Sequence, residues 1–108
     1  MNWTELTNEA ELNTIIEESK TQPVAIYKHS TRCHISAMAM NRLEREQAPD
    51  NIKFYYLDVI AKRPISNKVA ELFQVQHESP QLLLIKDGEC TYEESHNGIR
   101  MDELAEQI

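Results

Sequence analysis

The hydrophobic and polar positions of this chain follow helical and strand-like patterns in alternation. Residues 8–20 repeat apolar side chains at the spacing of one helical face, after Asn8 and Glu11 in a capping-box arrangement. Residues 24–27 are a continuous apolar run, which is typical of a strand buried on both faces. The later patterns predict, in order, a helix over 34–47, a strand over 52–59, a short helix opening at 63–64, a strand over 81–85, a strand over 89–94 after a turn at 87–88, and a helix over 101–108.

The order of these elements, α-β-α-β-α-β-β-α, predicts one α/β domain over residues 1–108. A strand, a helix and a strand, followed by a helix and a hairpin, give a four-stranded mixed sheet with helices on both faces. This arrangement resembles the thioredoxin-like fold, and its expected ligand position is outside the carboxyl end of a central strand. The second and third helices should pack on the sheet through two apolar faces, which are Ile35, Met38, Ala39 and Leu43, and Ile65, Val69, Leu72 and Phe73.

The composition narrows the classes of protein to which the chain can belong. Its 108 residues are 41% hydrophobic with only 2 glycines and 4 prolines, which indicates a compact domain rather than a disordered segment. No apolar run approaches membrane-spanning length, and residues 1–5 lack the features of a signal peptide, so we expect a cytoplasmic protein. The net charge of -7 argues against nucleic acid as a partner, because phosphates require a basic surface.

One segment of this acidic chain carries no acidic residue. Between Glu18 and Glu44 every charged side chain is basic. A buried strand explains the lack of acids in residues 23–27, but it does not explain the cations and imidazoles around Cys33. These side chains belong to Lys20, Lys28, Arg32 and Arg42, and to His29 and His34.

Cys33 lies between the predicted strand at 24–27 and the predicted helix at 34–47. A helix N-terminus offers positive partial charge and spare N–H groups, which favour a thiolate over a thiol. Three residues later, where a dithiol redox motif would have a second cysteine, the chain has Ser36. Ser36 could donate its hydroxyl to the Cys33 thiolate, or it could be an ordinary first-turn serine that caps the helix. The sequence therefore predicts one-thiol chemistry.

The polar side chains near Cys33 each have a functional and a plainer interpretation. Arg32 and His34 could stabilise the thiolate or an anionic thiol substrate, and the alternative is that both are solvated. Lys28 and His29 carry the same two interpretations, and in the plainer one Lys28 points outward from the strand end. The sequence alone leaves these alternatives open.

The other cysteine and the histidines give no support for a disulfide or a metal site. Two cysteines in a cytoplasmic chain are not a disulfide framework. Cys90 falls in the predicted fourth strand, at the sheet edge and far from Cys33, so we interpret it as an incidental cysteine rather than a resolving one. The four histidines show no metal-binding spacing, and no metal is expected.

Several motifs follow one another in a fixed order along nearly the whole chain. They are Lys28-His29-Ser30-Thr31-x-Cys33-x-Ile35-Ser36, Arg63-Pro64-x-Ser66-Asn67, His77-Glu78-Ser79-Pro80-Gln81 and Ser95-His96. Together these motifs resemble those of the YtxJ-type monothiol bacilliredoxins. The resemblance implies a thioredoxin-like fold and removal of bacillithiol from protein mixed disulfides, with no bound cofactor. It also implies that the Ser79–Pro80 bond is cis and faces Cys33, so that the backbone of Ser79 can pair with a substrate.

The resemblance further implies that bacillithiol is the thiol co-substrate and that bacillithiolated proteins are the clients. Bacillithiol carries carboxylates, which the basic segment around Cys33 would attract. One residue departs from the family pattern, because His34 stands where these proteins usually have a proline that stiffens the first helical turn. A histidine could instead add positive charge beside the thiolate or act as a proton donor.

Three functions are compatible with the sequence. The leading hypothesis is a one-cysteine exchange, in which Cys33 takes bacillithiol from a client and a second thiol regenerates it. The rival is a non-catalytic thioredoxin-like binding or adaptor domain, or a redox sensor, in which Cys33 is a sensor or a relic. A general disulfide reductase is disfavoured, because Ser36 replaces the second cysteine and resolution would have to use distant Cys90.

Overall fold

The computed structural model describes residues 2–108 and contains the predicted helices and strands in the predicted order, with one strand added at the start. The boundaries differ from the predicted ones by one or two residues, as is usual for element ends. Within residues 2–108, no helix has both the length and the apolar character needed to cross a membrane. The elements are β1 (Trp3–Glu5), α1 (Ala10–Glu18), β2 (Val24–His29), α2 (His34–Arg45), β3 (Lys53–Asp58), α3 (Arg63–Phe73), β4 (Gln81–Lys86), β5 (Glu89–Ser95), a short 3-10 helix (His96–Gly98) and α4 (Met101–Glu106).

The sheet is mixed, as predicted, but it has five strands in the order β1-β3-β2-β4-β5 rather than four. β2 and β3 are parallel, and β4 runs antiparallel to β2. β5 pairs antiparallel with β4 and forms one edge, while β1 pairs parallel with β3 and forms the other. The hydrophobic pattern does not reveal β1, because Thr4 and Glu5 are exposed and only Trp3 is half-buried.

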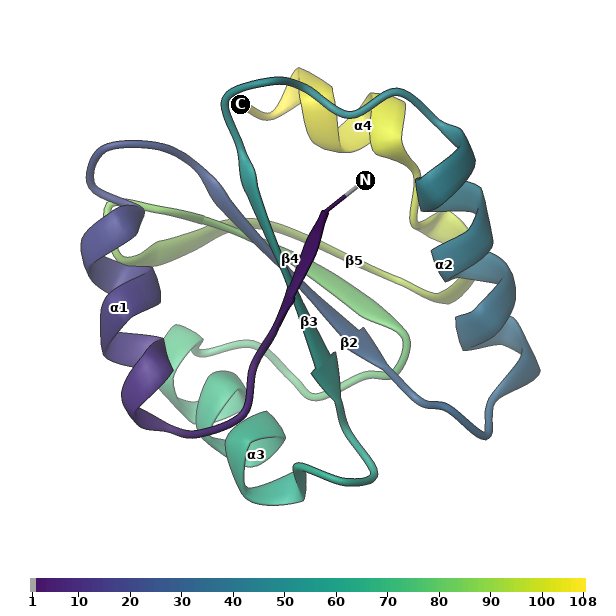
Figure 1. Ribbon diagram of the computed structural model, residues 1–108, viewed down its shortest axis with the longest axis horizontal. Helices are drawn as coiled ribbons and strands as arrows, with labels where there is room; N and C mark the ends of the chain where they lie inside the picture. Colours follow the sequence, from purple (N-terminus) through teal and green to yellow (C-terminus); the bar gives the residue numbers. More distant parts are fainter. Residues whose placement is uncertain (1) are drawn as a thin grey trace.

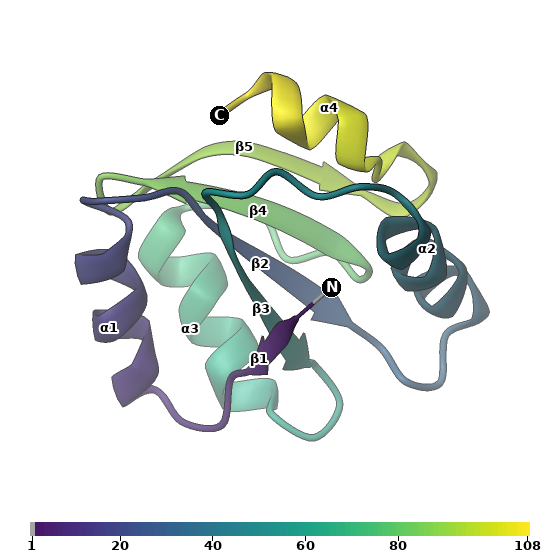
Figure 2. The same cartoon turned by 45° about the horizontal axis from the view of Figure 1, so that its top comes forward.

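Helices cover both faces of the sheet, with α1 and α3 on one face and α2 and α4 on the other (Figure 1 and Figure 2). The central strand β2 contributes alternate side chains to the two sides. Val24 and Ile26 belong to one apolar cluster, and Ala25 and Tyr27 belong to the other. All residues of β2 are buried. The segment that follows β2 therefore starts from a strand held on both faces.

Two local structures confirm predictions made from single motifs. At the start of α1, the Asn8 N–H donates to Glu11 Oε1 (3.2 Å) and the Glu11 N–H donates to Asn8 Oδ1 (3.2 Å), which is a capping box. At the β4–β5 turn, Asp87 and Gly88 have φ angles of 52° and 78°. Two positive φ angles are what a type I′ hairpin turn requires, and glycine adopts them without strain.

The inward face of α2 is narrower than the sequence predicts. The pattern places Ile35 and Met38 inside, but they are 42% and 51% exposed. A helix that packs on a sheet through one face buries a single stripe of residues at spacings of three and four. The buried residues of this stripe are Ser36, Ala39 and Leu43, so one of its positions carries a polar side chain.

Candidate active site

Cys33 stands at the junction of β2 and α2. After β2 ends at His29, a turn closed by a hydrogen bond from the Cys33 N–H to the Ser30 carbonyl (3.0 Å) brings the chain to the helix. Cys33 is the N-cap residue, and its carbonyl accepts the first helical hydrogen bond from the Ala37 N–H (3.1 Å). Its thiol is half-buried and free. The sulfur is thus carried by the residue that opens α2, where the first-turn amides and the helix dipole favour negative charge.

Ser36, which the sequence offers as a donor to the thiolate or as a simple cap, has a completely buried side chain. Its Oγ lies 2.6 Å from His29 Nδ1 and accepts a hydrogen bond from the Ser30 N–H (3.0 Å). Among residues 2–108, no hydrogen bond joins this hydroxyl to the Cys33 sulfur. The partners of Ser36 precede the helix instead of belonging to it. Ser36 therefore fastens the first turn of α2 to the end of β2, and neither sequence interpretation describes this geometry.

Tyr27 completes a polar cluster beneath the first turn of α2. Its hydroxyl donates to the Ser36 carbonyl (2.7 Å), and its ring packs between those of Trp3 and His29, with centroids 5.8 and 5.9 Å away. Burial raises the pKa of Tyr27 to about 12, against a smaller lowering by the hydrogen bond with Ser36. A negative charge on Cys33 adds to the rise in the pKa of Tyr27. The phenol therefore stays protonated and remains a donor at neutral pH.

The sequence assigns no role to Tyr27 and leaves His29 either as a group that stabilises the thiolate or a substrate, or as a solvated side chain. A usable signal was nevertheless present, because residues 27–29 continue directly from the apolar run at 24–27. If the central strand extends by two residues, these side chains are buried and need internal hydrogen-bond partners. The structure extends β2 to His29 in this way, and the partners come from α2 and α3.

Lys28 does not lie where either sequence interpretation places it. It is completely buried, and its Nζ lies 3.3 Å from the Ser66 carbonyl on α3 and 3.2 Å from His77 Nδ1 in the loop that follows α3. The interpretation that Lys28 points outward is therefore wrong, because the residue has no exposed surface, while its role toward the thiolate or a substrate stays a prediction. Burial lowers the pKa of Lys28 to about 8 and also lowers the pKa of His77. Three separate sequence motifs thus meet in one buried polar cluster.

Arg32 and His34 flank Cys33, and both side chains are exposed. His34 is the first residue of α2. Within the described chain, neither side chain forms a salt bridge, so both can meet a bound substrate. Arg42, from the same acid-free segment, is occupied instead, because its guanidinium donates to the Ile99 carbonyl at 3.0 and 2.8 Å. The role of Arg32 and His34 toward a substrate stays a prediction.

The Ser79–Pro80 peptide bond is cis, as predicted. Its position follows from the antiparallel register of β4 against β2, in which Gln81 pairs with Lys28. Pro80 therefore adjoins the carboxyl end of β2, the end from which the chain turns toward Cys33. The Ser79 hydroxyl is buried, and no hydrogen-bond partner for it exists among residues 2–108. Pairing of the Ser79 backbone with a substrate stays a prediction.

Cys90 lies at the other end of the sheet from Cys33. Because β4 is antiparallel to β2, the β4–β5 turn lies at the amino end of β2. Burial raises the pKa of the Cys90 thiol, which donates to the Tyr92 carbonyl (3.3 Å).

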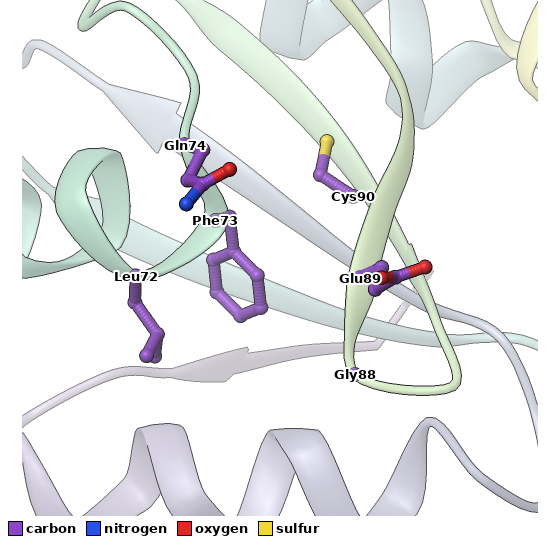
Figure 3. Close-up of a pocket in the computed structure, with 6 residues that line it drawn as sticks. All are labelled: Leu72, Phe73, Gln74, Gly88, Glu89 and Cys90. Atoms are coloured by element: carbon purple, nitrogen blue, oxygen red, sulfur yellow. The ribbon is translucent and has the colours of Figure 1, made fainter.

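Leu72, which the sequence places in the core, is 38% exposed near Cys90. A cavity of about 560 Å³ opens here between the end of α3 and the hairpin (Figure 3), lined by Leu72, Phe73, Gln74, Gly88, Glu89 and Cys90.

The arrangement supports nucleophilic chemistry at a single sulfur. Position 36 carries a hydroxyl where a second thiol would face the first, and Cys90 is separated from Cys33 by the length of the sheet. A disulfide formed by Cys33 with another molecule must therefore be opened by an external thiol. Within residues 2–108, no group of three or more His, Cys, Asp and Glu side chains is placed to hold a metal ion.

Comparison with known proteins agrees with this geometry. Residues 4–104 match the family described as monothiol bacilliredoxin BrxC. A solved structure of an oxidoreductase candidate with a thioredoxin fold is 31% identical, with a TM-score of 0.81 over 96% of this chain and 91% of that chain. The thioredoxin of Malassezia sympodialis is 17% identical, with a TM-score of 0.74 over 97% of this chain and 86% of its own. Mitochondrial thioredoxin 3 of Saccharomyces cerevisiae is 24% identical, with a TM-score of 0.69 over 96% and 91%.

The two thioredoxins share the fold, and they confirm the predicted thioredoxin-like architecture. The family match extends over nearly all the elements described above, including β2, the Cys33 turn and the cis-proline loop. It supports a thiol–disulfide redox function, which agrees with a single free thiol at a helix N-terminus. The chain belongs to the monothiol bacilliredoxin family.

Proposed function

We propose that this protein removes bacillithiol from protein mixed disulfides by a one-cysteine exchange at Cys33. The observation that carries the proposal is the free thiol at the N-cap of α2 in a chain of the monothiol bacilliredoxin family. Ser36 at the position of a second thiol supports a mechanism in which the resolving thiol comes from outside. Such an exchange needs a pool of reduced small thiols, which is the reason to assign it to the cytoplasm.

The chemistry proceeds in two exchanges that balance in atoms and electrons. The Cys33 thiolate attacks the bacillithiol sulfur of the client mixed disulfide, a new disulfide forms between Cys33 and bacillithiol, and the client leaves as a thiolate that takes a proton from water. A second thiol, as its thiolate, then attacks the bacillithiol sulfur of this adduct. The products are a disulfide between that thiol and bacillithiol, and the free Cys33 thiolate.

The surface next to Cys33 supports bacillithiol as the cargo. Arg32 and His34 are exposed on either side of the cysteine, and no acidic residue occurs between Glu18 and Glu44. The guanidinium of Arg32 can therefore attract the carboxylates of bacillithiol. The buried Lys28 does not take part in this attraction, so the exposed basic surface is smaller than the sequence suggests.

Intact-mass spectrometry tests the proposal directly. The reduced protein is incubated with a bacillithiolated client, and the expected result is one bacillithiol on Cys33 together with the release of free client thiol. The Cys90→Ser variant should behave like the wild type, because Cys90 lies at the far end of the sheet. The Cys33→Ser variant should neither take up bacillithiol nor release the client.

Three results would contradict the proposal. The first is the absence of any adduct on Cys33 in the wild type, together with removal of bacillithiol by Cys33→Ser at the wild-type rate. The second is stable binding of the client without exchange, which would indicate the rival function of a binding or adaptor domain. A disulfide between Cys33 and Cys90 after the reaction would instead indicate a general disulfide reductase.

A further inference from the structure

Three neighbours surround the hydroxyl of Ser36 and restrict the use of its single proton. His29 Nδ1 lies 2.6 Å from Ser36 Oγ, the Ser30 N–H donates to the same oxygen (3.0 Å), and the Tyr27 hydroxyl lies 3.4 Å away. Ser36 is 0% exposed and His29 is 8% exposed. Both side chains are therefore buried and take their hydrogen-bond partners from within the protein.

The bond between His29 and Ser36 can run in either direction. The Ser30 N–H can only donate, and the Tyr27 proton is engaged by the Ser36 carbonyl at 2.7 Å. If Nδ1 has no proton, the Ser36 hydroxyl must donate to it. If Nδ1 carries a proton, the ring donates to Ser36, and the serine proton becomes free for a third group. The protonation of one buried ring thus decides where the serine proton points.

The groups that face His29 favour the neutral ring. Tyr27 on the same strand and Tyr56 on β3 place their rings 5.9 and 5.7 Å from the imidazole. Burial lowers the pKa of His29, and the carboxylates of Asp58 and Glu44 raise it by less. At neutral pH the ring is therefore uncharged, and in the tautomer that carries its proton on Nε2 the Nδ1 atom accepts the serine proton. This arrangement agrees with the lack of a hydrogen bond from the serine to the thiol among the described residues.

We propose that His29 is a positioning residue that acts through Ser36 on the sulfur of Cys33. The neutral ring keeps the serine proton away from the sulfur, so the thiolate keeps its nucleophilicity for attack on the client disulfide. When the ring is protonated, the added proton stays on Nδ1, Ser36 keeps its own proton, and its hydroxyl can turn toward the start of α2. A Cys33 sulfur that accepts this hydrogen bond is a weaker nucleophile and a better leaving group.

The inference rests on the proposed exchange for its biological purpose, but the reversal of the hydrogen bond does not. It can therefore be tested without bacillithiol. The first measurement is ¹⁵N NMR of the His29 ring in the whole chain. At neutral pH we expect a neutral imidazole with its proton on Nε2, titrating below the ordinary histidine value of about 6.5. A ring that holds its proton on Nδ1 at neutral pH would overturn the proposal.

The second measurement is the pH profile for alkylation of Cys33 by iodoacetamide. The parent protein carries Cys90→Ser and His34→Gln, so that one thiol reacts and no other imidazole adjoins it in sequence. We expect two inflections in the parent, one from the thiol and a lower one from His29. The rate constant for alkylation of the thiolate should fall about threefold to tenfold when His29 takes up its proton. His29→Asn should lose the lower inflection, because its amide can occupy the place of Nδ1 but does not titrate.

Ser36→Ala provides an independent check, because it leaves the His29 ring in place and should also remove the lower inflection. The exposed His96 is the matched control, and His96→Asn should keep both inflections. A purely structural role would lower the rate or the melting temperature of the variants and leave both inflections present, which would refute the proposal. Failure of the bacillithiol adduct to form would refute the proposed function alone, since neither measurement contains bacillithiol.

Discussion

Replacing Lys28 by methionine should remove a pH dependence of stability that the buried lysine imposes on the protein. Lys28 is 0% exposed, and its partners are the Ser66 carbonyl and His77 Nδ1. Within residues 2–108 no carboxylate forms a salt bridge with it. The fold therefore holds an ammonium group without a counter-ion. Burial accordingly lowers the pKa of Lys28 from 10.5 to about 8.

The sign and size of the effect follow from this pKa. The unfolded chain binds the Lys28 proton more tightly than the folded protein, so protonation favours unfolding. The difference between a pKa of 10.5 and one of about 8 corresponds to a destabilisation of the folded protein by about 3 kcal/mol. This destabilisation is fully present below the folded pKa and disappears above the unfolded pKa. Between about pH 7 and pH 9.5, Lys28 should therefore raise the free energy of unfolding of the wild type by about 2 kcal/mol.

Urea unfolding of wild type and Lys28→Met across this pH range measures the difference. Methionine is unbranched and of similar length, so it fills the site while removing the charge and both hydrogen bonds. At neutral pH, the loss of the two hydrogen bonds offsets part of the stability gained by removing the buried charge. The diagnostic quantity is therefore the change of the unfolding free energy with pH and not its value at one pH. Tyrosines and cysteines titrate in both proteins and cancel in the comparison.

Lys68→Met on α3 is the matched control, because this lysine is exposed and pairs only weakly with Glu71 at 3.9 Å. Its unfolding free energy should follow that of the wild type in parallel across the pH range. The burial of His77 and the Lys28 ammonium both lower the pKa of His77, so that ring stays neutral throughout and adds no slope. Parallel curves for wild type and Lys28→Met would refute the reasoning, because they would show that the buried lysine binds its proton as tightly as the unfolded chain.

Two further predictions concern the surroundings of the thiol. Arg32→Gln should slow exchange with a bacillithiolated client about threefold and leave exchange with an uncharged disulfide unchanged. The control is Arg45→Gln at the other end of α2, which should alter neither rate. Equal slowing by Arg32→Gln on both substrates would contradict an attraction for carboxylates. Tyr27→Phe should lower the free energy of unfolding by about 1 kcal/mol, because the Ser36 carbonyl loses a buried donor. Tyr56→Phe is the control in denaturant unfolding, and equal losses in both variants would count against the hydrogen bond as the cause.

The hydrophobic pattern was sufficient to predict the central part of the fold. The apolar run at 24–27 indicated a buried strand, and the helix after Cys33 had to be a crossover if the next strand was parallel. β1 could not be predicted in the same way. Its three residues gain their strand conformation from pairing with β3 in the register of Trp3 with Phe54, which is information that a local pattern does not contain.

The location of Cys33 was predictable, but the directions of its neighbours were not. Lys28 and His29 are adjacent in sequence and were interpreted together as flanking polar groups. Once β2 extends to His29, strand alternation sends Lys28 toward α3 and His29 toward α2. A count of charges along the chain therefore overestimated the basic surface near the thiol, because it could not show which cations were inside.

Ser36 does more than leave position 36 without a second thiol, because its hydroxyl also holds the turn before α2 in place. Its oxygen accepts the Ser30 N–H at 3.0 Å and bonds His29 at 2.6 Å, and the Ser36 side chain is completely buried. Sulfur is a weak acceptor, so a thiol at this position would leave the half-buried Ser30 amide poorly satisfied and loosen the turn that presents Cys33. The polar cluster beneath α2 thus favours a hydroxyl at position 36 for structural reasons, and the same hydrogen bonds explain why the first turn of α2 offers Cys33 no second thiol.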